Sequence, residues 1–323
     1  MIKTAIVPTS MLVATALMAL TPLIASGQDG EHTPSQTPWG HPDLRGHWLP
    51  GTAAPMETPS SGEAWVRPPE ERALGPGFRF FEGHSDAPDI IRQEQTMVVD
   101  PPDGKIPLQP WAAEKRVEIM AKSDEIEFLD PRVKCLPAAV PRGNLPVGYN
   151  TYQFLQTENA VILLYEWNHL FRYIPLDGTP PVASDIRLGM GDSRGHWEGD
   201  TLVVEVSNFT DNTWVVGHGA PAENAPASSF TSGHGVFHSD ELKVVERFTL
   251  VDEDTIHYEA TITDPNVFTQ PWTISYDAFM RGDEDHILYE YACHEGNARN
   301  LKLMTGAGGE VSVALEHVAK VGK

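Results

Sequence analysis

The sequence predicts an all-β fold in which antiparallel strands follow one another around an up-and-down barrel. From Thr151 onward, apolar and polar residues alternate with a period of two, which is typical of half-buried strands. Short turn signals separate the alternating segments, with almost no helix between them, and connections this short cannot link parallel strands. Closing the sheet removes its exposed edges, so a barrel is favoured and a two-sheet sandwich is the alternative.

Eight segments carry this alternation. They are Thr151–Gln156, Val161–Glu166, Leu170–Ile174, Thr201–Ser207, Leu242–Leu250, Thr255–Thr263, Trp272–Phe279 and Ile287–Cys293. Turn residues such as Asp177-Gly178, Glu198-Gly199-Asp200 and Arg281-Gly282-Asp283 lie between them. We therefore expect residues 151–323 to form the barrel domain.

The first 27 residues have the pattern of an export signal. Lys3 supplies a short positive region, and an interrupted apolar stretch runs from Ala5 to Ala25. Small residues at Ala25-Ser26-Gly27 offer a cleavage site for signal peptidase, and the prolines in the stretch argue against a membrane anchor. We expect the mature protein to begin at or near Gln28 and to be periplasmic or secreted.

Residues 28–150 form a Pro- and Gly-rich extension that we expect to pack on the barrel. Its one clear helix is predicted at 110–122, where Pro110 occupies a permitted first position. An apolar face of this helix is expected at positions i, i+4 and i+7, from Ala113 through Val117 to Met120. The proline-rich stretch 130–150 is predicted to be a loop.

The charge of the chain limits its partners. The formal net charge is −22, from 23 basic and 45 acidic residues. Such acidity disfavours nucleic acids, whose binding depends on neutralised phosphates, and it disfavours anionic lipid surfaces. A small molecule is therefore the expected partner, with no nucleic acid and no membrane after signal cleavage. The sequence carries no signal for an oligomeric state.

Two cysteines, Cys135 and Cys293, allow two interpretations. In an exported protein a single pair can form a disulfide. Buried free thiols are also common, because cysteine behaves as a small apolar residue. Both alternatives stay open.

Several ionisable side chains fall on the inward, otherwise apolar rows of the predicted strands. Glu246, Tyr258 and Arg172 each lie between apolar residues at i−2 and i+2, and Glu166 ends an apolar row. A carboxylate inside a barrel is costly unless it is paired or its pKa rises. Glu246 or Glu166 therefore forms a structural salt bridge with Arg172, or is a pocket carboxylate available for acid–base chemistry.

Three histidines, His169, His238 and His294, lie where predicted strands begin or end. Each alone is most often a surface or hydrogen-bonded residue. Imidazole also binds divalent metals, but HExxH, HxH and CxxC spacings are missing. We therefore expect no cofactor and keep a divalent metal bound by these three histidines as an alternative.

Polar and aromatic residues concentrate between Gly189 and Phe248, where loops adjoin predicted strands. Together with the inward rows, they define one candidate pocket. The expected catalytic residues are Glu166, His169, His238, Glu246 and His294. The expected substrate-binding residues are Arg172, Arg194, Trp197, Trp214 and Tyr258.

Several stretches resemble a family of exported, functionally uncharacterised proteins of environmental bacteria. They are Leu163–His169, Gly191–Val204 (GDSRGHWEGDTLVV), Val245–Phe248, Pro271–Thr273 and Tyr291–Asn297 (YACHEGN). His196 departs from the family pattern, in which Arg is more frequent at this position. Gly46-His47-Trp48 separately resembles the lipocalin Gly-x-Trp hallmark, which implies a lipocalin-like barrel with the tryptophan ring at its closed end. The family resemblance implies export but no particular reaction.

We expect an exported β-barrel enzyme that acts by acid–base chemistry on a small apolar or aromatic substrate. Hydrolysis, elimination, hydration and isomerisation all fit this expectation. The first alternative is a non-catalytic small-molecule binding or carrier protein that uses the same pocket. The second alternative is a metal-dependent enzyme with the three histidines as ligands.

Overall fold

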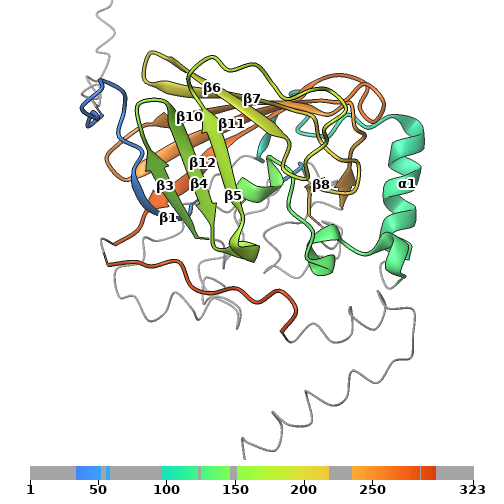
Figure 1. Cartoon of the computed structure of the whole chain (residues 1–323). Coiled ribbons are helices and arrows are strands. Elements are labelled where there is room, and N and C mark those ends of the chain that lie inside the picture. Colours follow the sequence, from blue (N-terminus) through green and yellow to red (C-terminus); the bar gives the residue numbers. More distant parts are fainter. Residues whose placement is uncertain are drawn as a thin grey trace, which may run out of the picture. The chain divides into compact units, whose positions relative to one another are not determined.

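Ten strands form one antiparallel sheet in the computed structural model, which describes residues 34–51, 56–58, 96–122, 125–145, 151–217, 235–283 and 285–295 (Figure 1). The expected export signal lies outside the described residues. The strands of this sheet are β1 (Gly46–Pro50), β2 (Val98–Asp100), β3 (Tyr152–Gln156), β4 (Ala160–Tyr165), β5 (Phe171–Pro175), β6 (Asp192–Glu198), β7 (Thr201–Ser207), β10 (Lys243–Leu250), β11 (Thr255–Thr263) and β12 (Trp272–Arg281). A separate two-stranded sheet contains β8 (Trp214–Val216) and β9 (Val236–Phe237).

The strands of the large sheet wind in chain order around a nearly closed barrel. The path is β5-β4-β3-β1-β12-β11-β10-β7-β6, and β2 pairs with β12 beside it. All pairs along this path are antiparallel, most of them join strands that follow each other in the large sheet, and β12 returns to pair with β1. The predicted antiparallel up-and-down barrel is therefore confirmed, and the sandwich alternative is not what forms.

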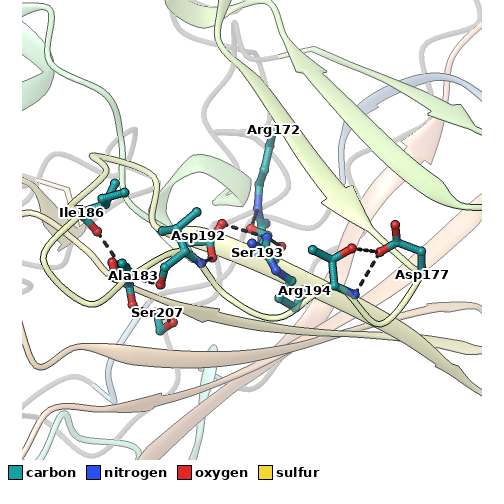
Figure 2. A network of polar contacts seen from close by, with 11 residues as sticks. Arg172, Asp177, Ala183, Ile186, Asp192, Ser193, Arg194 and Ser207 are labelled. Carbon is teal, nitrogen blue, oxygen red and sulfur yellow. Dashed lines mark hydrogen bonds and ion pairs between the residues drawn. The ribbon is translucent and has the colours of Figure 1, made fainter.

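The two ends of this path, β5 and β6, meet through side chains. Arg172 of β5 donates from Nε to Ser193 Oγ of β6 at 2.8 Å (Figure 2). Gly195 of β6 lies so close to β5 that an added Cβ would approach Ile174 Cγ2 and Leu176 Cδ2 to 2.7 Å each. Because glycine has no Cβ, β5 and β6 can approach each other closely at Gly195, and this approach nearly closes the barrel.

Strand β6 corrects one expectation from the sequence. None of the eight predicted strands covers Asp192–Glu198, yet this segment forms seven residues of strand paired with β7. The turn itself contains only Gly199 and Asp200, in agreement with the turn signal there. Arg194 and Trp197 therefore lie on a strand and not on a loop.

Strand β1 comes from the segment before residue 151 and completes the barrel between β3 and β12. Trp48 of β1 is fully buried, and its Nε1 donates to Leu44 O at 2.9 Å. The guanidinium of Arg281, at the end of β12, lies 4.4 Å from the centroid of the Trp48 ring. The Gly-x-Trp sequence thus anchors the first strand to the last one.

The inward rows of the barrel match the alternation in the sequence. On β10, Val244, Glu246, Phe248 and Leu250 are buried, and on β11 the same is true of Ile256, Tyr258, Ala260 and Ile262. A bulge opposite Ile256 and His257 brings both Ala278 and Phe279 of β12 to the buried side. The predicted inward position of Glu246, Tyr258 and Arg172 is confirmed.

The only α-helix among the described residues is α1 (Pro110–Ala121), close to the predicted range. Its buried residues are Ala112, Arg116 and Ile119, whereas Val117 is 66% exposed, so the expected apolar face was wrong. Arg116 belongs to the buried face because it pairs with Glu57 at 2.5 Å. Within the described part of the chain, no helix is long and apolar enough to cross a membrane.

Short 3-10 turns connect the remaining elements, and two of them lie near the candidate residues. The turns are η3 (Ile126–Phe128), η4 (Pro131–Lys134), η5 (Arg142–Asn144) and η6 (Trp167–His169). The disulfide between Cys135 and Cys293 joins the end of η4 to the last described segment, with a Cα–Cα distance of 5.9 Å. The disulfide alternative is therefore the correct one.

The predicted strand Ile287–Cys293 does not form. This segment has no strand partner, and Ile287 and Tyr289 are 60% and 57% exposed. Tyr291 instead contacts the turn η6, because its N–H donates to His169 Nε2 at 2.9 Å and its hydroxyl accepts from Trp167 Nε1 at 3.1 Å. A 3-10 turn offers no ladder of backbone groups, so the alternating sequence remains extended without joining the sheet.

Candidate functional site

Glu246 lies inside the barrel at the centre of a buried hydrogen-bond network. Its carboxylate forms a two-point ion pair with Arg172, in which Nη1 donates to Oε1 at 3.0 Å and Nη2 donates to Oε2. The hydroxyl of Tyr258 donates to Oε1 at 2.7 Å. Glu246 is 0% exposed and Arg172 is 3% exposed, so both charges are removed from water.

Burial and neighbouring charges keep Arg172 and the buried tyrosines of this network protonated. Burial alone would lower the pKa of Arg172, but the charge of Glu246, the nearby Tyr165 and the hydrogen bond to Glu246 together outweigh this effect and raise the pKa. Burial raises the pKa of the Tyr258 phenol, and the nearby carboxylate of Glu246 raises it further. Burial likewise raises the pKa of Tyr165 to about 12. The tyrosines therefore remain hydrogen-bond donors.

A loop segment around η5 enters the barrel and completes this network. Asn144 Nδ2 donates to Glu246 Oε1 at 3.0 Å, and its Oδ1 accepts from Tyr165 at 3.1 Å. The hydroxyl of Tyr276 donates to the Asn144 carbonyl at 2.7 Å, and that of Tyr152 donates to the Gly143 carbonyl at 3.3 Å. Since these tyrosines lie on inward rows, η5 occupies the interior that an open pocket would need.

The Glu246 network therefore favours the structural salt-bridge alternative over a pocket carboxylate. Both carboxylate oxygens accept hydrogen bonds from donors supplied by Arg172, Asn144 and Tyr258. Arg172 also reaches Ser193 across the gap between β5 and β6 (Figure 2). Removing this carboxylate from water costs free energy, and its partners on other elements offset that cost. Because the offset depends on these partners staying in place, the ion pair holds the strands together.

The three histidines lie in different environments. His238 is buried: its Nδ1 donates to Ser239 O at 2.8 Å, and its Nε2 accepts from Thr213 Oγ1 at 2.8 Å. Burial lowers the pKa of His238 and keeps it neutral. His169 on η6 and His294 beside Cys293 are both exposed. Among the described residues no group of three His, Cys, Asp or Glu side chains is placed to hold a metal ion.

Glu166 lies outside the Glu246 network, at the start of η6. The hydroxyl of Thr151 donates to its carboxylate. Burial raises the pKa of Glu166, and the hydrogen bond from Thr151 partly opposes this rise. Glu166 therefore shares its turn with His169, whose N–H donates to the Glu166 carbonyl at 3.3 Å, and not with Arg172.

The expected substrate-binding residues are also dispersed. Arg194 donates to Asp192 Oδ1 at 2.8 Å on its own strand (Figure 2). Trp197 stacks on His41 with ring centroids 4.9 Å apart. Trp214 packs with Ile119 of α1 in a small apolar cluster. Of the predicted residues, the structure brings together Arg172, Glu246 and Tyr258 in one network and, separately, Glu166 and His169 on one turn.

A different constellation lies on the outward face of β11 and β12. His257 Nδ1 donates to Asp277 Oδ1 at 2.7 Å, and Ser275 Oγ donates to His257 Nε2 at 2.9 Å. The imidazole thus bridges a hydroxyl and a carboxylate through its two different nitrogens, as in a Ser-His-Asp triad. The side chains of His257 and Asp277 are 27% and 30% exposed, so solvent reaches them.

Strand geometry explains this arrangement. His257 is directly opposite Asp277, and Ser275 lies two residues earlier on the same face of β12. The bulge at Ile256 and His257 adjoins the His257–Asp277 pair, and bulges often redirect side chains next to functional sites. The sequence signal was available, because His257 lies on the polar row of one predicted strand, and Ser275 and Asp277 lie on the polar row of the next. Only the register of the two strands shows that these residues meet.

Comparison of the chain with protein-family models, with curated proteins and with solved structures found no match.

Proposed function

We propose that this protein is a hydrolase that uses Ser275 as a nucleophile against small esters or related acyl compounds. The observation that carries the proposal is the hydrogen-bonded chain Ser275–His257–Asp277, with distances of 2.9 and 2.7 Å. The nucleophile contacts a base, and a third group orients that base, which is the arrangement that activates a serine hydroxyl. Hydrolysis is also one of the reactions expected from the sequence.

The roles of the three residues follow from their contacts. The Ser275 hydroxyl proton passes to His257 Nε2 as Oγ attacks the ester carbonyl carbon. The imidazolium, held by Asp277 at Nδ1, then gives this proton to the departing alcohol, and an acyl-serine forms. Water activated by the neutral His257 attacks the acyl-serine and releases the carboxylic acid and free Ser275.

The backbone at Ser275 predicts that turnover is slow. The Ser275 N–H donates to Met97 O at 2.9 Å and is therefore not available to stabilise the oxyanion. Loss of one oxyanion donor typically slows serine hydrolases by about 10²- to 10³-fold. Formation of a stable covalent adduct is thus a more sensitive test than steady-state hydrolysis.

The test is reaction of the folded protein with a fluorophosphonate. Ser275 Oγ attacks phosphorus, fluoride leaves, and the adduct is measured by intact mass and located by peptide mapping. We expect one adduct, at Ser275, that disappears in Ser275→Ala and forms more slowly in His257→Gln and Asp277→Asn. The matched control is Thr273→Ala, because Thr273 lies two residues away on the same face and its hydroxyl bonds to that of Thr261 at 3.0 Å.

Absence of the adduct from the wild-type protein, or an equal adduct in Ser275→Ala, would overturn the proposal. The non-catalytic binding protein would then be the better interpretation. Circular dichroism of each variant shows whether the fold is retained, which we expect because outward polar residues contribute little to stability.

Export of this hydrolase is part of the proposal. The Cys135–Cys293 disulfide supports a location outside the cytoplasm, since disulfides persist in oxidising compartments. Membership of the exported bacterial family is likewise proposed from the motifs. Of these, Gly191–Val204 builds the β6–β7 hairpin, and Tyr291–Asn297 carries the disulfide-bonded Cys293.

A further inference from the structure

We infer that Glu259 selects substrates that carry a positive charge near the scissile ester, an inference that rests on the proposed function. Glu259 on β11 is the cross-strand partner of Ser275 on β12. Side chains of directly opposed residues start about 4.5–5.5 Å apart at Cβ and point to the same face of the sheet. The Glu259 carboxylate therefore borders the position of an acyl compound attacked by Ser275.

The charge of Glu259 is available to a ligand. In the part of the chain that the structure describes, no hydrogen bond or ion pair joins the carboxylate of Glu259 to another residue. Its other cross-strand neighbour, Arg247, donates to Glu198 Oε2 at 2.9 Å. The cation directly opposite Glu259 is thus already paired, while Asp277 adds a second negative charge beside His257.

The surroundings reinforce this preference. The chain carries a formal net charge of −22, which attracts cations and repels anions at long range. Thr261 and Thr273, the next outward pair, are uncharged and bond to each other at 3.0 Å. A quaternary or primary ammonium group two or three bonds from the ester oxygen would lie against Glu259 without displacing any described hydrogen bond.

The experiment compares two esters that differ only in charge. Acetylthiocholine carries a trimethylammonium group, and 3,3-dimethylbutyl thioacetate replaces it with an uncharged tert-butyl group of similar shape. Thiol release is followed at low ionic strength in the wild type, Glu259→Gln and Ser275→Ala. Glu205→Gln is the matched control, because it removes an exposed charge from β7 that is not adjacent to Ser275.

We expect kcat/KM for the cationic ester to exceed that for the neutral ester by roughly five- to tenfold in the wild type. This ratio should fall to near one in Glu259→Gln, remain in Glu205→Gln and decrease with added salt. Equal rates for both esters, with hydrolysis that still depends on Ser275, would overturn the cation preference and leave the hydrolase proposal standing. Hydrolysis that persists in Ser275→Ala would overturn both.

Discussion

Asn144 donates a hydrogen bond to Glu246 at 3.0 Å and thereby joins the 3-10 turn η5 to the interior of the barrel. The two residues are 102 positions apart in the chain. The same carboxylate pairs with Arg172, so one buried group connects η5, β5 and β10. The Glu246 network therefore fixes the turn η5 to the inner wall of the barrel.

Glu246→Gln should lower the free energy of unfolding by about 3–5 kcal/mol, because it leaves the buried charge of Arg172 without its partner. Denaturant unfolding followed by tryptophan fluorescence measures this change. Glu205→Gln, at an exposed position of β7, should shift stability by less than about 0.5 kcal/mol. Unchanged stability of Glu246→Gln would contradict the structural role and return Glu246 to the candidates for acid–base catalysis.

Asn144→Ala should cost about 1–3 kcal/mol, since it removes a donor to Glu246 and an acceptor for Tyr165 within a buried site. Combination with Glu246→Gln should cost less than the sum of the two single changes, because both disrupt one network. Thermal unfolding of the single and double variants completes the cycle. Strict additivity would show that Asn144 and Glu246 act independently.

Removal of the disulfide should destabilise the protein by about 4–5 kcal/mol in the chain-entropy model, because the bond closes a loop of 158 residues. The measurement is the unfolding midpoint of Cys135→Ser/Cys293→Ser. Wild-type protein treated with reductant is the control and should match the double variant. A double variant as stable as the oxidised wild type would mean that contacts such as Tyr291–His169 hold the segment without the disulfide.

His238 should make stability sensitive to mild acid. Burial lowers the pKa of folded His238 below the unfolded value of about 6.5, so the unfolded chain binds the proton first. Stability should be complete above this value, decline as the pH falls through it, and level off below the folded pKa. The decline should be smaller in His238→Gln and unchanged in His294→Gln, an exposed control, as measured by unfolding between pH 4 and 8. An identical decline in His238→Gln would assign the acid sensitivity to other groups.

The buried face of α1 can be tested by a pair of substitutions. Ile119→Ala should cost about 2–5 kcal/mol, because the side chain packs against Phe128 and Trp214. Val117→Ala should change stability by less than about 0.5 kcal/mol, since Val117 is 66% exposed. A larger loss of stability in Val117→Ala than in Ile119→Ala would instead support the apolar face expected from the sequence.

The barrel could be predicted from the sequence because each strand carries its own alternation, and turn residues mark where strands end. The inward positions of Glu246, Tyr258 and Arg172 followed from the same local pattern. Strand Ile287–Cys293 failed because alternation shows only that a segment is suited to a sheet, whereas pairing requires a neighbouring strand. The Cys293 disulfide and the Tyr291 contacts hold this segment against a 3-10 turn instead.

The candidate site was less predictable, because it depends on which residues meet across long separations. Nothing local to Asn144 indicates that a proline-rich loop enters the barrel. Ser275 and His257 lie on different strands, and a shift of one residue in their pairing would move them to opposite faces. The positions of His169, His238 and His294 at predicted strand ends suggested one shared site. Strand ends in a barrel, however, are distributed around its circumference, so residues at different ends need not meet.

The pairing of β1 with β12 has a consequence for the order in which the protein folds. Arg281 bonds to the carbonyl of Arg45 across 236 positions, so the first strand made must wait for the last one. A contact of this range is formed late and slowly, because its loop-closure entropy is lost before other contacts compensate. Until Arg281 has been synthesised, β12 is incomplete and β1 lacks one of its two neighbours. The unpaired edge of β1 is therefore exposed to aggregation during synthesis.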